Sequence, residues 1–286
     1  MKFFRPLLVV LLVVCFIGTA HAGAPFNNLE GVGGCGFNPF AYPGGSKIKV
    51  PEKSKESSTK SVINEVSKYV GMPQAGVWYT VLPSVNVNWF ATGVSDVIMD
   101  RLEISYGYEA IWQRHAATHN QHNIGTKFLV VPENFNNFQF MPALSIGAIY
   151  KNTDNVIPGS KHYGWDGYLV ATKMITQLPR PVIISGGALI TNAYVLGAFG
   201  YDDDSVVTGF ANADLVLTDQ IIVGGEFKQG AHFQMLKNAN YWNIHAAWMV
   251  NKDLTLVTAL MLAGDYRSRD RVGLGNGFTV SAQYAF

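Results

Sequence analysis

The last ten residues of the chain alternate strictly between apolar side chains and small or polar ones. Phe278, Val280, Ala282, Tyr284 and Phe286 occupy one register, and Gly277, Thr279, Ser281, Gln283 and Ala285 occupy the other. A period of two places the first set on one face of a β-strand and the second set on the other face. Such a strand leaves backbone amides unpaired unless neighbouring strands cover both of its edges. The sequence therefore favours a sheet that pairs the C-terminal strand on both sides.

The same alternation recurs along the chain from Gly76 onward. Trp242, Ile244 and Trp248, for example, are separated by the polar residues Asn243 and His245 and by an alanine pair. Strands that cross a bilayer at a tilt need about 9–11 residues. Segments of this character, with turn residues between them, are 77–92, 100–112, 123–131, 141–151, 163–175, 182–200, 206–217, 221–229, 240–250, 254–263 and 275–286.

The connections between these segments alternate in length. Counted backward from the C-terminus, connections 251–253, 218–220 and 177–181 are short, whereas 264–274, 230–239, 152–162 and 113–122 are long. The exception is 132–140, which is longer than its place in the series predicts. Short turns at one mouth and longer loops at the other are typical of membrane β-barrels. The sequence thus predicts a closed antiparallel up-and-down transmembrane β-barrel.

The number of strands follows from a parity argument. Eleven segments are an odd number, whereas bacterial single-chain barrels have an even number of strands. We therefore expect one more strand and place it at 29–42, although Pro39 and four glycines make this segment a poor strand. The expected count is 12 strands, with 10 to 14 allowed.

The chain divides into three parts. Residues 1–22 have the charged start, apolar stretch and Ala20-His21-Ala22 site of a secretory signal peptide. Residues 23–75 form an N-terminal segment that contains the expected strand, a flexible Lys/Ser-rich loop at 46–60 and a short amphipathic helix at 57–70. This helix could plug the pore, lie on the membrane or cap an outer loop. Residues 76–286 form the barrel.

Composition excludes several classes of function. Without Lys2 and Arg5 the chain has 19 basic and 20 acidic residues, so it lacks the basic surplus of a nucleic-acid-binding protein. Cys35 is the single cysteine after the signal peptide, so an intramolecular disulfide is excluded. The chain has no G-x-S-x-G, H-E-x-x-H or phosphate-binding glycine loop. We therefore expect neither an enzyme nor a cofactor.

Two stretches carry a resemblance to known proteins. The closing strand resembles that of Gram-negative outer-membrane β-barrels, which typically end in Phe. This implies that Tyr284 and Phe286 form the signal for the barrel assembly machinery. The segment Asn28-Leu29-Glu30-Gly31-Val32-Gly33-Gly34, with Phe37-Asn38-Pro39 and Ala41-Tyr42 after it, resembles the start of an uncharacterised Gram-negative family catalogued only as a domain of unknown function. Asp100–Gly107 and Val131–Asn134 extend the match. The resemblance implies an outer-membrane location after export across the inner membrane and supplies no activity.

The polar residues of the inward register are the main functional candidates. They are Arg101, Glu103, Glu109, Lys127, Lys151, Lys173, Asn212, Asp214, Glu226, Lys228, Asn243, His245 and Gln283. They would line an aqueous passage for small polar solutes, which predicts a channel or transporter. Alternatively, they would pair with one another inside a closed barrel with a structural, adhesive or assembly role. A strand count near 12 leaves both readings open, because narrower barrels are filled and wider ones are open.

Two outer loops offer weaker signals. His115, His119 and His122 could approach a metal ion, but their loop contributes no Cys, Asp or Glu to complete a ligand set, so we expect no metal site. Arg267, Arg269 and Arg271 could contact phosphate groups of lipopolysaccharide. The expected partners are therefore outer-membrane lipid, lipopolysaccharide and the assembly machinery, and the oligomeric state stays open.

Overall fold

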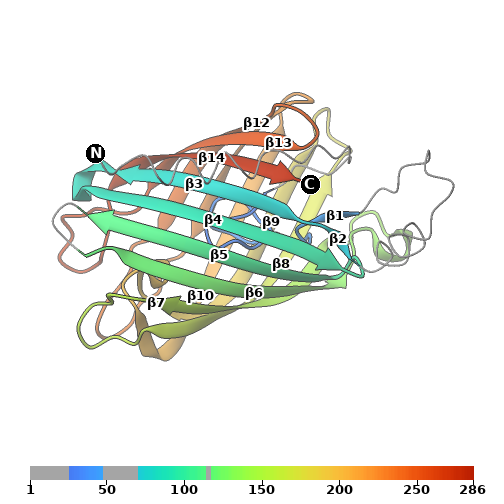
Figure 1. Ribbon diagram of the computed structural model, residues 1–286. Coiled ribbons are helices and arrows are strands. Elements are labelled where there is room, and N and C mark those ends of the chain that lie inside the picture. The colour runs from blue at the N-terminus through green and yellow to red at the C-terminus, as the bar shows by residue number, and fades with distance from the viewer. Residues whose placement is uncertain (1–25, 48–69, 114–116) are drawn as a thin grey trace, which may run out of the picture.

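The computed structural model of the chain describes residues 26–47, 70–113 and 117–286. Twelve antiparallel strands, β3 to β14, close into one barrel in which strands adjacent in sequence are adjacent in space (Figure 1). The last strand pairs with the first along a register that runs from Phe278 opposite Val81 to Ala285 opposite Gln74. The predicted up-and-down barrel and its count of 12 strands are confirmed.

The barrel strands are β3 (Gln74–Leu82), β4 (Val87–Ile98), β5 (Leu102–Gln113), β6 (His119–Val131), β7 (Ala143–Thr153), β8 (Tyr163–Ile175), β9 (Val182–Ala193), β10 (Tyr201–Val216), β11 (Ile221–Lys228), β12 (Tyr241–Met249), β13 (Leu254–Leu262) and β14 (Asn276–Ala285). Outside the barrel, β1 (Ser46–Lys47) pairs with β2 (Gly71–Met72). Three short 3₁₀ turns are η1 (Pro83–Val85), η2 (Phe135–Asn137) and η3 (Tyr194–Gly197). Among the described residues, no helix is long and apolar enough to cross a membrane.

The alternation read from the sequence separates the two faces of the barrel wall. On β12, Trp242, Ile244 and Trp248 are exposed on the outer face, whereas Asn243 and His245 are buried inside. The exposed fractions of Ile244 and His245 are 64% and 6%. Because successive side chains point to opposite faces, every strand contributes to an apolar outer belt and a polar interior.

The twelfth strand lies elsewhere than predicted. The segment 77–92, expected to be one strand, contains most of β3 and the first half of β4. The turn between them is η1, followed by Asn86 with a positive φ of 51°. Pro83 and Asn86 are turn-forming residues, and the long apolar run around them obscured this signal. Residues 93–99, between the expected segments 77–92 and 100–112, consequently lie mostly within β4.

The segment 29–42 is not a barrel strand, so its assignment was wrong. Residues 26–45, which we call the plug, run inside the barrel, where they appear as the blue trace in Figure 1. The plug folds on itself through isolated bridges that pair Asn27 with Gly33 and Gly34 with Pro39. An even strand count required one more strand, and the segment 77–92 provides it because it contains parts of both β3 and β4. The Gly- and Pro-containing segment is therefore left free to fill the interior.

The remaining N-terminal predictions lie largely outside the described residues. This applies to the signal peptide at 1–22, to the loop at 46–60 except for Ser46 and Lys47, and to the helix at 57–70 except for Val70. Val70 forms an antiparallel bridge with Ile98 of β4.

The two ends of the barrel differ as the connection lengths predicted. At the end where Phe286 lies, here called the terminal mouth, the turns 99–101, 176–181, 217–220 and 250–253 are short and the loop 132–142 is the long exception. The opposite end, the loop mouth, has the longer connections 154–162, 194–200, 229–240 and 263–275. It also has the short turn 83–86.

Candidate functional site

Most of the predicted inward-facing residues lie inside the barrel. Buried there are Glu103, Glu109, Lys127, Lys151, Asn212, Asp214, Glu226, Lys228, Asn243, His245 and Gln283. They surround the plug, and many of them bind it directly. The interior of the described barrel is therefore packed with polar side chains against a second layer of polypeptide.

Arg101 and Lys173 do not line the interior, so their prediction was wrong. Arg101 is exposed in the turn before β5, and its guanidinium lies 3.4 Å from the carbonyl oxygens of Leu129 and Val130. The predicted alternation had been extended past the true start of the strand. Lys173 has the outward register of β8 and binds the loop 132–142 at the terminal mouth, with its Nζ atom 3.0 Å from a Glu133 carboxylate oxygen.

The plug enters and leaves the barrel through the terminal mouth. At its start, the Asn27 backbone amide donates to Oε1 of Gln283 (2.9 Å), and its side-chain amide donates to the carbonyl of Gln74 (3.2 Å). At its end, Gly44 lies against Gln74 and Ser95. Gln74 begins β3 and Gln283 is near the end of β14, so both ends of the plug lie at the same mouth.

The middle of the plug reaches deep into the barrel. Phe37 is 1% exposed, belongs to an apolar cluster with Trp89 and Met261, and contacts the ring of Tyr241 with centroids 6.5 Å apart. Tyr241 begins β12 at the loop mouth. The plug is therefore a loop inserted from one mouth whose turn approaches the other.

Two paired glycines of the wall make room for the backbone of the plug. Gly93 of β4 and Gly107 of β5 are register partners. A Cβ atom on Gly93 would lie 2.3 Å from Cα of Gly31, and one on Gly107 would lie 2.3 Å from the carbonyl oxygen of Glu30. Gly31 itself has a φ of +86°, which favours glycine. Because these two wall positions have no side chains, the backbone of the plug packs directly against the backbone of the wall.

Glu103 and Lys127 bind the plug from adjacent strands. Their charged groups are 2.6 Å apart and fully buried. Glu103 accepts from the backbone amides of Gly33 (2.9 Å) and Gly44 (2.5 Å), while Lys127 donates to the carbonyl of Gly33 (2.8 Å). Both charges therefore acquire partners from the plug as well as from each other, as buried charges require.

A second charged group centres on Lys151 of β7. Its ammonium lies 2.7 Å from the Asp166 carboxylate and forms an ion pair with Glu30 of the plug. Burial alone would raise the pKa of Glu30, but the positive charges of Lys151 and Lys228 hold this pKa below its ordinary value of 4.5. Glu30 is therefore held ionised inside the barrel.

On the opposite wall, Glu226 and Lys228 of β11 hold the turn of the plug. Glu226 accepts from the backbone amides of Phe37 and Asn38, both at 3.2 Å, and Lys228 donates to the carbonyl of Phe37 at 3.2 Å. The Asn38 side chain donates to the carbonyl of Phe227 at 3.0 Å. Wall and plug thus exchange hydrogen bonds in both directions.

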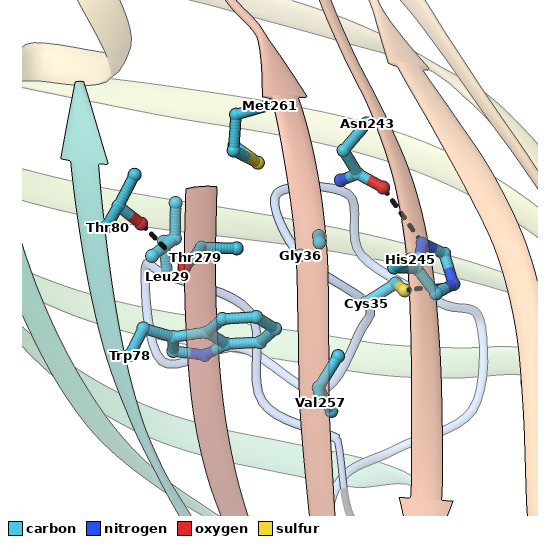
Figure 2. A pocket seen from close by; sticks show the side chains of 11 residues that line it. Leu29, Cys35, Gly36, Trp78, Thr80, Asn243, His245, Val257, Met261 and Thr279 are labelled. Carbon is cyan, nitrogen blue, oxygen red and sulfur yellow. Dashed lines mark hydrogen bonds between the residues drawn. The ribbon is translucent and has the colours of Figure 1, made fainter. Parts of the chain in front are cut away.

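Cys35 of the plug approaches His245 of β12. Its Sγ atom lies 3.6 Å from Nε2 of His245, and the same nitrogen lies 2.7 Å from Oδ1 of Asp214. Figure 2 shows the contact between Cys35 and His245. Burial, together with the negative charges of Glu226 and Asp214, raises the pKa of the Cys35 thiol well above its usual range.

The loop 194–200 folds into the loop mouth. Val195 and Leu196 adopt positive φ values of 50° and 61°, which turn the chain inward. The carbonyl of Leu196 accepts from Gln121 at 3.0 Å, and that of Gly197 accepts from the Thr153 hydroxyl at 2.9 Å. The loop packs against the apolar cluster that contains Phe37. It narrows the mouth above the turn of the plug.

A cavity of about 440 Å³ opens beneath the plug at the terminal mouth. It is lined by Phe40, Tyr42 and Pro43 of the plug and by wall residues such as Met174 and Met249. The Tyr42 hydroxyl donates to Glu133 of the loop 132–142 (2.9 Å). The loop 132–142, which was the exception to the alternation of connection lengths, therefore binds the plug at this mouth.

His119 and His122, two of the three weak candidates for metal ligands, are not brought together. His119 and His122 of β6 have opposite registers, and His122 binds the hydroxyl of Tyr106 on the outer face (2.8 Å). His115 lies outside the described residues.

Sequence reasoning missed the plug residues Glu30, Cys35 and Asn38, because their segment was assigned to a strand. The available signal was composition. Glycines at 31, 33, 34 and 36 among buried asparagines are typical of a backbone that packs closely against another one.

The comparisons with known proteins define the family and the fold. The family model described as "Protein of unknown function (DUF3034)" matches residues 23–274, so the chain belongs to this family, as the resemblance implied. The structure is similar to the KdgM porin (TM-score 0.50, 10% identity, 74% of this chain and 99% of that one). It is also similar to the NanC porin (TM-score 0.51, 9% identity, 75% and 100%). No curated protein matches significantly. At these identities the likeness shows a porin-like barrel fold alone.

Proposed function

We propose that this DUF3034 protein is an outer-membrane channel for small polar solutes that its N-terminal plug holds closed. The membrane location is supported by the outer belt, where apolar residues such as Ile104, Ile124, Leu169 and Leu260 are exposed on strands around the barrel. Exposed apolar surface on this scale is typical of contact with lipid.

One observation carries the proposal of a channel: both ends of the plug lie at the terminal mouth. A loop inserted in this way can withdraw without threading its end through the barrel and without breaking any barrel ladder. With the plug withdrawn, Glu103, Lys127, Lys151 and Glu226 would face water, which can solvate their charges. A polar wall of mixed charge is suited to small hydrophilic solutes.

The orientation follows from the connection lengths. Short turns mark the periplasmic side of such barrels and longer loops the outer side, which would place the terminal mouth and the plug ends in the periplasm. The exposed Arg267, Arg269 and Arg271 of the loop 263–275 would then face the lipopolysaccharide phosphates. Tyr284 and Phe286, whose rings contact each other, would be read by the assembly machinery.

Conductance across planar bilayers tests the proposal. The wild-type protein should remain mostly closed, with discrete openings under applied voltage. A variant lacking residues 26–45 should show a long-lived open level, and shortening the loop 194–200 in addition should raise the conductance further. Retained heat-modifiable gel mobility would show that each variant barrel is folded.

The alternative is a closed barrel with a structural or adhesive role. It is favoured by the loop mouth, where Val195 and Ala198 pack with Phe37 in an apolar cluster that water does not readily replace. If the folded variant without residues 26–45 and with a shortened loop 194–200 never conducts, this alternative replaces the channel.

A further inference from the structure

Three groups with metal-binding atoms meet where the plug contacts the wall, and a fourth lies beside one of them. They are Cys35 of the plug, Asp214 of β10, Glu226 of β11 and His245 of β12, and all are buried. The ligand atoms of Cys35, Glu226 and His245 lie within 4.8 Å of one another. Cys35 is far from the other three residues along the chain, so the sequence alone does not indicate this cluster.

The hydrogen bonds around His245 leave one ring nitrogen facing acceptors. The Asn243 amide nitrogen donates to Glu226 (2.5 Å), which fixes the amide so that its oxygen faces Nδ1 of His245 (2.8 Å). Nδ1 must therefore carry a hydrogen and donate. Nε2 lies 2.7 Å from a carboxylate oxygen of Asp214, and two such acceptor atoms require a proton or a cation between them. The Cys35 sulfur lies 3.6 Å from the same nitrogen.

A neutral imidazole that donates through one nitrogen and presents the other to a cation is the usual arrangement of a metal-binding histidine. The separation of the sulfur and nitrogen ligands fits a tetrahedral ion. With a Zn–S bond of about 2.3 Å and a Zn–N bond of about 2.05 Å, the sulfur and nitrogen ligands are separated by about 3.6 Å, and Sγ of Cys35 lies 3.6 Å from Nε2 of His245. The Asp214 oxygen is closer, at 2.7 Å, and coordination would lengthen this contact to about 3.4 Å.

We propose that Cys35, Asp214, Glu226 and His245 form a Zn²⁺ site that joins the plug to the barrel wall. One thiolate, one imidazole and carboxylate oxygens are a donor set that zinc accepts. Glu226 already accepts hydrogen bonds, but a carboxylate has further lone pairs for a metal. Two carboxylates beside a single imidazole also leave negative charge for a divalent cation to offset.

A small cavity adjoins the cluster on the side of Cys35 and His245. Its volume is about 10 Å³, and Cys35, Gly36, Asn243 and His245 are among the residues that line it (Figure 2). Apolar side chains such as Trp78, Val257 and Met261 line the rest of it, and Asp214 and Glu226 do not, so the ion would lie among the four ligands beside this cavity. Binding would replace the thiol hydrogen of Cys35 by a sulfur–metal bond and release the proton to solvent.

The test uses the full-length barrel refolded in detergent, with Co²⁺ added during refolding as a spectroscopic probe. We expect about one equivalent of Co²⁺, visible absorption typical of tetrahedral coordination, and a near-ultraviolet sulfur-to-cobalt charge-transfer band that Zn²⁺ abolishes. The band requires a thiolate ligand, and Cys35 is the single cysteine after residue 22. The wild-type measurement therefore tests the site without any variant.

Two variants give the matched comparison. Cys35→Ser should abolish the charge-transfer band and weaken Zn²⁺ binding at least ~10-fold, whereas His122→Gln on the outer face should retain both. Wild-type protein without the band, or Cys35→Ser with unchanged zinc affinity, overturns the site and leaves a His245–Asp214 ion pair in its place. Because metal binding is measured directly, the outcome is independent of whether the barrel conducts.

Discussion

Substituting Gly107 by valine should dislodge the plug while leaving the wall ladder intact. Gly107 is an inward residue of β5 that pairs regularly with Gly93 and Asn123. A Cβ atom there would lie 2.3 Å from the carbonyl oxygen of Glu30, whereas ordinary contact begins at 3.4 Å. Because the obstructing atom belongs to the plug backbone, it cannot rotate away. The plug must move by about 1 Å at this point.

The magnitude follows from this overlap. Overpacking of a filled interior costs about 1–3 kcal/mol, and the displacement also disturbs the ion pair of Glu30 with Lys151. A change of about 1–3 kcal/mol corresponds to a shift of about 5- to 150-fold in the ratio of closed to open barrels. Open probability in planar bilayers should rise by about that factor, and the plug should become more accessible to protease.

Gly186→Val is the matched control. Gly186 has the outward register of β9, and a Cβ atom there would have its nearest neighbour at 3.4 Å, in ordinary contact. The control should behave as wild type. The reasoning is refuted if a folded Gly107→Val barrel has the closed level, open probability and protease resistance of this control.

Three further outcomes are expected. Lys127→Met should destabilise the barrel by about 3–5 kcal/mol in thermal unfolding, because it leaves Glu103 buried without its cation. The double variant Lys127→Met/Glu103→Gln should recover much of this lost stability. Additive effects of the two substitutions would argue against an interaction between these residues. The pKa of Glu30 is lowered in the folded protein, so its contribution to stability is complete above pH 4.5 and is lost as the pH falls through the folded pKa. Conductance should therefore rise below about pH 4.5 in the wild type, and a Glu30→Gln variant with the same pH response would contradict this role. Phe286→Glu should lower the membrane yield of folded barrel, measured by heat-modifiable mobility, and a normal yield would count against an assembly signal at the C-terminus.

The strands were predictable because each one carries its own evidence. Outward and inward side chains alternate within ten residues, as in Trp242 to Trp248. Lipid outside the wall favours apolar side chains, and the packed polar interior favours polar ones, so each strand shows the pattern by itself. The prediction of strand boundaries failed where only one or two residues mark the boundary. Pro83 and Asn86 form a turn inside a long apolar run, and Arg101 sits one residue outside its strand.

The content of the barrel interior was not predictable in the same way. Buried polar residues look alike in sequence whether they face water or another segment, so the list of Glu103, Lys127 and their neighbours could not distinguish an open passage from a filled one. The partners that decide this are distant in sequence: Gly33 with Glu103, Phe37 with Glu226, and Cys35 with His245.

The sequence by itself determined the closed barrel, its even strand number and the inward register of most of its charges, because period-two alternation and edge pairing are local constraints. The tertiary structure decided that residues 26–45 fill the interior instead of extending the wall. Their glycines allow backbone to pack against backbone, as Gly31 does on Gly93 and Gly107. Their fit to the wall is a property of the closed barrel, which exists only once β14 has paired with β3.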